Sequence, residues 1–287
     1  MTASLSIRKL QQYRADTFRL KAQSRVRTQE EAISFVNQRG FVFFWPIRGI
    51  VLPSLWTAVA GDRDVASEHD DPGHITWRWK DSLLGARVWY YAKVLRKRAT
   101  MIALDVVPFF YALSENYGSP EEDYLLQYQQ GHLKQETKNV YEALLRESPL
   151  DTIALRRAAR LSSKESSYRF DRALGDLQAD FRILPIGVAE VGAWKYAFVY
   201  ELVHRYFPEL PEQARRIGEA QAREELTRRL FASVGAAQLR DVMKLFGWRK
   251  QAAEAAVEAL MNQGDLVQGL QMRDHTGDWI ALASLLA

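Results

Sequence analysis

The sequence offers few side chains that could carry out chemistry. It contains no cysteine, so thiol nucleophiles, disulfides and thiolate metal sites are excluded. Asp105 is the one acidic residue in the apolar run from Met101 to Phe110, and a carboxylate in apolar surroundings is a weak candidate for acid or base catalysis. A hydrogen-bonded structural aspartate is the competing interpretation. The loop from Glu68 to His74 has carboxylates and imidazoles, but their spacing matches no known metal site, so we predict neither a metal nor a cofactor.

Basic and hydroxylated residues gather where two predicted helices begin. Such side chains, together with the amides at a helix start, bind the phosphates and base edges of DNA. In the first helix the candidate DNA contacts are Lys164, Ser166, Ser167, Arg169 and Arg172. In the second helix they are Arg249 and Lys250, although Glu254 and Glu258 farther along would repel phosphate. A solvated helix face is the competing interpretation of both groups.

Aromatic residues beside cations form a second type of candidate site. The basic cluster Arg96, Lys97 and Arg98 follows Tyr90 and Tyr91, a combination that suits a single strand or an extruded base. A basic turn above a buried aromatic cluster is the other interpretation. Phe43 and Trp45 stand in the dense aromatic segment 41–46, where the hydrophobic core is favoured over a base-stacking pocket.

These candidates must be positioned by folded elements, and residues 133–200 predict one complete module. Apolar residues at helical spacing give a first helix over 133–144, and Asp151 can cap a second, short one. Ser162 and Glu165 have the spacing of a capping box that opens a third helix. Apolar runs at 183–184 and 194–198, with a turn at 191–193, then predict a hairpin. Three helices followed by a hairpin is the order of a winged helix-turn-helix, whose third helix usually enters the DNA major groove.

The same module recurs near the C-terminus. A shift of 83 residues places Phe170, Leu174 and Leu177 of the predicted third helix on Ala253, Val257 and Leu260. Helices over 212–234, 238–246 and 249–263, then a hairpin with a polar turn at 274–278, complete the second copy. A fainter copy at the N-terminus has a helix from the capping residue Thr28 to Gly40, a short helix within 52–60 and a loop over 61–74. Over segment 77–113 the sequence pattern does not distinguish helix from strand.

These patterns predict a mainly α protein with small β-hairpins, an α+β fold of tandem winged helix-turn-helix domains. We expect an N-terminal domain at 1–120 and winged-helix domains at 121–208 and 209–287. The chain has 287 residues with a net charge of +4, which fits an anionic partner without requiring one. No signal-peptide core or membrane-spanning run is apparent, so a cytoplasmic, nucleoid-associated protein is expected. The oligomeric state is not indicated.

Several segments resemble the YcaQ/AlkZ family of bacterial DNA glycosylases, over most of the chain. They are 77–83, 109–113, 169–178 with the strand into Val188, 196–198 and 241–248. The resemblance implies tandem winged helices that form a concave DNA-binding surface. Characterised members of that family excise alkylated bases, including bases joined in interstrand crosslinks.

The sequence departs from the family at the catalytic motif. In the family a glutamine, any residue, and then glutamine or aspartate follow a glycine that closes an early helix. Here Phe43 and Trp45 stand in those positions after Gly40, and neither side chain can accept a proton or orient water. The tryptophan and histidine that the family tends to carry before a proline have no counterpart in 101–108, and no C-terminal β-barrel is expected.

We therefore expect a protein that binds duplex or damaged DNA, with its status as an enzyme left open. The alternatives are an active glycosylase that excises alkylated or crosslinked bases, and a transcription regulator.

Overall fold

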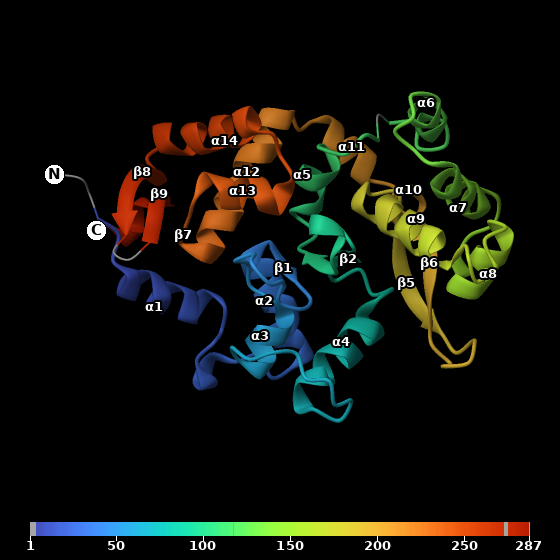
Figure 1. Ribbon diagram of the computed structural model, residues 1–287, viewed down its shortest axis with the longest axis horizontal. Coiled ribbons are helices and arrows are strands. Elements are labelled where there is room, and N and C mark those ends of the chain that lie inside the picture. The colour runs from blue at the N-terminus through green and yellow to red at the C-terminus, as the bar shows by residue number, and fades with distance from the viewer. Residues whose placement is uncertain (1–3, 117, 273–274, 287) are drawn as a thin grey trace.

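Three small antiparallel sheets, each surrounded by helices, lie along the chain (Figure 1). The computed structural model describes residues 4–116, 118–272 and 275–286. Each sheet has three strands, and in each the last strand in sequence lies between the other two. We call each sheet together with the helices around it a unit, and we number the three units in chain order. No helix in the described ranges is long and apolar enough to cross a membrane.

The first unit contains the segment that the sequence left without a choice between helix and strand. Its elements are α1 (Ile7–Thr17), α2 (Gln29–Arg39), β1 (Phe41–Phe43), α3 (Leu55–Ala60), α4 (Ile75–Leu83), β2 (Tyr90–Ala92), β3 (Thr100–Ile102) and α5 (Val107–Tyr111). Thr28 caps α2 by accepting a hydrogen bond from the backbone N–H of Glu31 at 3.2 Å. Gly40 ends the helix with a φ of 80°, which favours glycine. Both predicted ends of this helix are therefore confirmed.

The second unit follows the predicted order of elements. They are α6 (Asp123–Gln129), α7 (Gln135–Arg146), β4 (Leu150–Asp151), α8 (Thr152–Ala158), α9 (Ser167–Ala179), β5 (Ile183–Ala189), β6 (Ala197–Leu202) and α10 (Val203–Tyr206). Asp151 caps α8 by accepting hydrogen bonds from two backbone N–H groups, at 2.8 and 3.0 Å. The capping box expected at Ser162 and Glu165 is wrong, because both residues precede the helix and α9 starts only at Ser167.

The third unit repeats the second. Its elements are α11 (Leu210–Arg215), α12 (Glu219–Val234), β7 (Ala236–Ala237), α13 (Leu239–Phe246), α14 (Lys250–Asn262), β8 (Leu266–Met272) and β9 (His275–Leu282). A shift of 83 residues carries the bounds of α9 onto those of α14, and the bounds of β5 onto those of β8. The repeat predicted from the sequence is confirmed.

Two details of the third unit differ from the prediction. One long helix was expected over 212–234, but Gly218 separates α11 from α12. Of the expected turn at 274–278, Asp274 lies outside the described residues and 275–278 belong to β9.

All three units share one order of helices and strands. A helix leads into a short strand, two helices follow, and a hairpin closes the sheet, as in α7–β4–α8–α9–β5–β6. The first unit follows the same order from α2 to β3, so the fainter N-terminal copy is present as well. The expected α+β fold of tandem winged helices is confirmed.

Hydrophobic packing joins the units rather than separating them. One large core contains Phe41 and Phe43 from β1, Phe181 from the second unit, and Phe231 and Leu245 from the third. The second unit has in addition a core of its own. Because the shared core crosses residues 120 and 208, the expected division into three domains stays a prediction.

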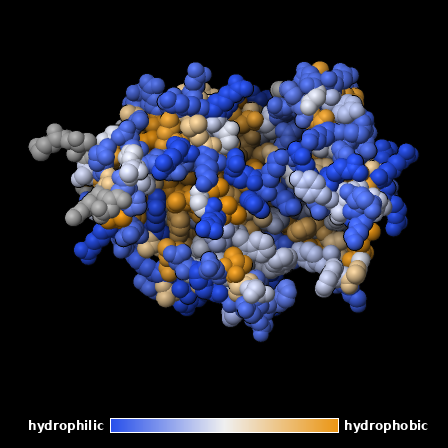
Figure 2. Space-filling model, viewed as in Figure 1, coloured by the Kyte–Doolittle hydropathy of each residue, from blue (hydrophilic) through white to orange (hydrophobic). Residues whose placement is uncertain are grey.

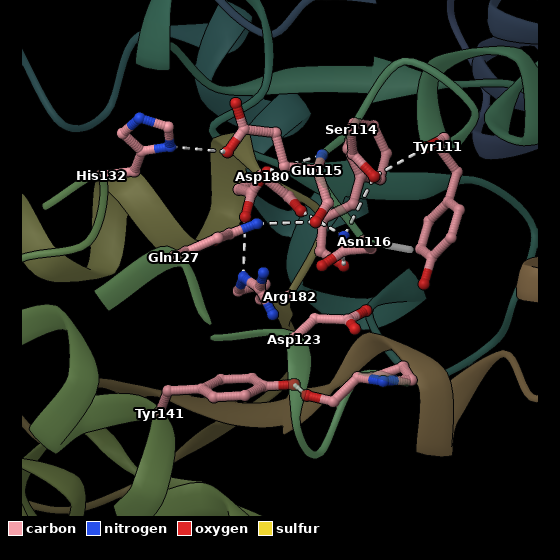
Figure 3. A network of polar contacts seen from close by, with 12 residues as sticks. Tyr111, Ser114, Glu115, Asn116, Asp123, Gln127, His132, Tyr141, Asp180 and Arg182 are labelled. Atoms are coloured by element: carbon pink, nitrogen blue, oxygen red, sulfur yellow. Dashed lines mark hydrogen bonds and ion pairs between the residues drawn. The ribbon is translucent and has the colours of Figure 1, made fainter. Parts of the chain in front are cut away.

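A polar network fixes the second unit against the end of the first (Figure 3). The side-chain amide of Asn116 donates to the carbonyl of Asp180 at 2.6 Å, and Arg182 donates to the Asp180 carboxylate at 2.7 Å. Gln127 donates to the carbonyl of Glu115 at 2.6 Å. Burial raises the pKa of the Asp180 carboxyl, and the Arg182 guanidinium opposes that shift. These contacts fix the segment between α9 and β5 against the residues that follow α5.

Candidate functional site: an aromatic pocket beside the hairpin of the second unit

A pocket of about 900 Å³ opens where the first unit meets the β5–β6 hairpin. Figure 1 shows this hairpin reaching down beside α4. Three aromatic side chains supply much of the wall: Trp45 after β1, Trp77 on α4 and Tyr196 before β6. The remaining lining residues are Val65, Ala66, Ser67, His69, His74, Arg78, Asp81 and Ser82. Trp45 and Trp77 lie 5.4 Å apart, and Trp77 and Tyr196 lie 6.1 Å apart, between ring centroids.

Phe43 and Trp45 lie in different surroundings, although they are only two residues apart. Phe43 is fully buried in the core that all three units share. Trp45 lies two residues beyond β1 and is partly buried against the core cluster that contains Phe44, with 5.0 Å between the centroids of the two rings. The core prediction is confirmed for Phe43, whereas Trp45 is partly buried against a core cluster and also lines the pocket. The indole N–H of Trp45 has no partner in the described part of the chain.

The buried cation Lys80 packs against aromatic side chains that line the pocket. The side chain of Lys80 is 2% exposed, and its Nζ lies 4.5–5.8 Å from the centroids of five aromatic rings. These rings belong to Phe44, Trp77, Tyr91, Tyr196 and Phe198. Burial lowers the pKa of the Lys80 ammonium, and Asp81 partly offsets the shift.

Lys80, Asp81 and Tyr196 form one hydrogen-bonded group. The Tyr196 hydroxyl accepts from Lys80 Nζ at 3.0 Å and from Trp77 Nε1 at 3.2 Å, and it donates to Asp81 Oδ1 at 2.9 Å. Lys80 Nζ lies 2.7 Å from the same carboxylate oxygen. Burial raises the pKa of the Tyr196 hydroxyl, and Asp81 adds to the rise. The group connects α4 of the first unit with the hairpin of the second.

The hairpin carries the most exposed aromatic residue of the described chain. Trp194 was expected in a strand, but β5 ends at Ala189 and β6 starts at Ala197, so it lies in the connecting loop. Its side chain is 91% exposed. Figure 2 shows pale residues at the lower right, where this hairpin ends, on a face that is otherwise mostly hydrophilic. An exposed indole two residues from Tyr196 is an available stacking surface next to the pocket.

The predicted DNA contacts at the start of α9 lie mostly on the surface. Lys164, Arg169 and Arg172 are exposed and Ser167 is partly exposed. Ser166 is buried, and its hydroxyl donates to the carbonyls of Leu161 and Ser163 at 2.6 and 2.7 Å. Its assignment as a DNA contact is therefore wrong. Arg169 is paired with Glu136 at 3.0 Å, an exposed contact that phosphate could replace at little cost.

The basic turn after β2 lies between α9 and α13. Arg96, Lys97 and Arg98 are exposed, and Lys97 is paired with Asp176 on α9. Arg96 and Lys97 have φ values of 55° and 54°, a left-handed conformation that is strained in residues other than glycine. The aromatic neighbours expected to stack beside them are not available. Tyr90 is fully buried in the shared core, and Tyr91 is packed against Lys80.

Of the remaining candidates, Arg249, Lys250 and Asp105 lie outside the pocket, whereas His69 and His74 of the loop 68–74 line it. Arg249 and Lys250 are exposed at the start of α14, and Lys250 is paired with Glu254 at 3.5 Å. Asp105 is exposed and paired with Arg229 at 3.2 Å, so the prediction that its carboxylate lies in apolar surroundings is wrong. In the loop 68–74, Asp71 caps the short helix that starts at Pro72, and His74 packs on Trp56. Among the described residues no group of three metal-binding side chains comes together.

Five residues of this site were not identified from the sequence: Trp77, Lys80, Asp81, Trp194 and Tyr196. A lysine and an aspartate adjacent to each other in an aromatic segment, 77–83, were the available signal. Their partner Tyr196 lies 115 residues beyond Asp81, and no local pattern brings it to them.

Comparisons with known proteins agree with this arrangement of units. A family model described as AlkZ related matches residues 26–247. The solved structure of the Streptomyces sahachiroi DNA glycosylase AlkZ is similar with a TM-score of 0.58 at 14% sequence identity, over 99% of this chain and 71% of that chain. At this identity the similarity shows a shared fold. A search of curated proteins found no match.

Proposed function

This chain belongs to the AlkZ-related family, and from that premise we propose that it binds DNA and holds an extruded base in the pocket beside Trp45. The solved structure to which it is similar is that of a DNA glycosylase, a class of enzyme that acts on bases taken out of the stack. Duplex DNA, intact or damaged, is the proposed partner. The proposed place of action is the cytoplasm, at the nucleoid.

The observation that carries the proposal is the pocket itself. Its volume of about 900 Å³ is within the range of small-molecule sites, and it has more than enough room for a nucleobase. Proteins hold extruded bases by stacking between aromatic side chains and by hydrogen bonds to the base edge. Trp45, Trp77 and Tyr196 supply the rings, and Asp81 and Ser82 supply polar groups. All five residues lie inside the matched range 26–247.

The surroundings of the pocket support binding of the DNA that carries the base. The exposed Trp194 loop adjoins the pocket through Tyr196, and apolar wedges of this kind insert between base steps. Arg169 and Arg172 on α9 and Arg78 at the pocket supply positive charge at exposed positions of the second and first units. The hairpin of a winged helix flanks its third helix, so α9 and the Trp194 loop can contact one duplex.

The proposal is tested by comparing two tryptophan variants on two DNA probes. The probes are a fluorescent duplex with one unpaired base and the same duplex fully paired. Trp45→Ala should weaken binding to the unpaired probe by about 1–3 kcal/mol, the usual scale of base–aromatic stacking. Trp279→Ala is the matched control, since Trp279 is also partly exposed but lies at the core formed by β8 and β9.

The two probes and a melting curve separate the outcomes. Selective loss on the unpaired probe by Trp45→Ala, with the melting temperature nearly unchanged, supports the pocket. Equal loss on both probes, or a loss that matches unfolding, contradicts it. If the unaltered protein binds neither probe at low salt, the chain is not a DNA-binding protein and the whole proposal fails.

A further inference from the structure

Asp81 is the one carboxylate that lines the aromatic pocket. Its side chain is 22% exposed. Oδ1 accepts the Tyr196 hydroxyl at 2.9 Å and lies 2.7 Å from Lys80 Nζ, so the orientation of the carboxylate is fixed from behind. Oδ2 has no hydrogen bond to any other residue in the described part of the chain. One oxygen is thus held by the protein and the other is left to whatever occupies the pocket.

Asp81 is the kind of group that cleavage of an N-glycosidic bond requires and that the side chains at the end of β1 do not supply. Cleavage of an N-glycosidic bond develops positive charge on the sugar, and it requires a group that stabilises that charge or activates water. The side chains at the end of β1 are Phe43, buried in the core, and Trp45, whose indole can donate but not accept a hydrogen bond. Asp81 lines the same pocket as Trp45 and Trp77, and its carboxylate can accept a proton.

We propose that Asp81 is the catalytic carboxylate of this pocket, and that it activates water for hydrolysis of the N-glycosidic bond of a base held among Trp45, Trp77 and Tyr196. This inference rests on the proposed binding of an extruded base. Lys80 and Tyr196 are positioning residues that hold Oδ1. Asp105, the carboxylate that the sequence singled out, does not line the pocket and has no part in the reaction.

The reaction consumes water and one base-bearing nucleotide. Water attacks the sugar carbon C1′ as the C1′–N bond breaks, and the electron pair of that bond leaves with the base. The proton of the water passes to Asp81 Oδ2 and then to solvent. A base made cationic by N-alkylation is neutralised by the electron pair that it receives, so its departure needs no acid. A nucleotide whose base carries a positive charge is therefore the substrate on which the role of Asp81 can be tested without an acid for the leaving base.

The experiment measures release of free base from a duplex that contains one N7-methylguanine, by liquid chromatography and mass spectrometry. Asp81→Asn should lower the rate on the order of 100-fold or more, the scale of a positioned general base. DNA affinity should change little. Asp64→Asn, an exposed aspartate outside the pocket, is the matched control and should release base at the normal rate.

A second pair of variants keeps the test valid if Asp81→Asn leaves Lys80 as an unpaired buried charge and unfolds the chain. Lys80→Met removes that charge, and Lys80→Met/Asp81→Asn should then release base far more slowly than Lys80→Met alone. The same loss in both would overturn the role of Asp81, as would a borohydride-trapped adduct that disappears in Lys80→Met. DNA binding without base release by the unaltered protein overturns the inference and leaves the binding proposal standing. Absence of both binding and release defeats both.

Discussion

The second and third units have the same backbone order but present different surfaces to solvent. Helices α9 and α14 are related by a shift of 83 residues, as are strands β5 and β8. On α9 the exposed residues include Tyr168, Arg169 and Arg172, whereas the positions 83 residues later in α14 are Gln251, Ala252 and Ala255, with the acidic Glu254 and Glu258 nearby on the same helix. In the second unit, a seven-residue loop, 190–196, connects the two hairpin strands and carries an exposed tryptophan.

The difference shows which part of a winged helix is fixed by folding and which part is free to change. Apolar residues recur at the same places in both copies because each copy must bury one face of its third helix. Exposed positions contribute little to stability, so they can change from basic to uncharged without loss of the fold. We infer that the second unit supplies the proposed contacts with DNA, and that the third serves mainly to build the shared core.

The largest expected effect tests whether α9 and α14 hold equivalent core positions. Phe170 and Ala253 are related by the shift of 83, and both are buried. Phe170→Ala should lower the free energy of unfolding by about 3–5 kcal/mol because it leaves a cavity. Urea denaturation measures the loss, and Tyr168→Ala is the control, since Tyr168 is 74% exposed. Equal losses for the two variants would mean that Phe170 does not anchor the second unit.

The next effect concerns the loops of the two hairpins. Trp194→Ala should weaken binding to duplex DNA by about 1–3 kcal/mol if the indole stacks on bases. Stability should not change, because the side chain is almost fully exposed. Affinity is measured by fluorescence anisotropy, with His275→Ala on β9 as the equivalent change in the third unit. If His275→Ala weakens binding as much as Trp194→Ala, the proposal that the two hairpins differ in function is contradicted.

A smaller effect should separate the basic residues of α9 from those of α14. Each phosphate contact contributes about 0.9 to the slope of log affinity against log salt concentration. The triple variant Lys164→Ala/Arg169→Ala/Arg172→Ala should therefore flatten the slope clearly. Arg249→Ala/Lys250→Ala should change it less, because Glu254 and Glu258 weaken the attraction of α14 for phosphate. A flat slope for the unaltered protein would contradict the DNA-binding proposal, and equal changes in the two variants would contradict the comparison.

The smallest expected effect is a dependence of stability on pH that arises from His204 in the second unit. Burial lowers the pKa of the His204 imidazole below its ordinary value of 6.5, with Arg205 adding to the shift. The unfolded chain then binds more protons than the folded one, so the His204 contribution is complete above pH 6.5 and is lost as the pH falls below it. His204→Gln should melt with less pH dependence than the unaltered protein. The exposed His132→Gln is the control, and the same change in both would exclude His204 as the cause.

The sequence by itself determined several helix ends and the repetition of the module. Thr28, Asp151 and Gly40 mark helix ends because capping depends on residues within a few positions of one another. The stripe from Phe170 to Leu177 and its copy 83 residues later followed from the helical period alone. The resemblance to a glycosylase family was visible in the sequence and agrees with the family match over 26–247.

Only the tertiary structure decided which side chains meet. The local sequence does not distinguish Phe43 from Trp45 as core residues. The packing of the third unit against β1 buries Phe43, while Trp45 lies at a pocket. Asp105 looked enclosed in an apolar run and is exposed, whereas Lys80 lies among aromatic rings from both sides of a unit boundary. Asp81 and Tyr196 are 115 residues apart in the chain. Local periodicity carries no information about such contacts, because they depend on how the units pack against one another.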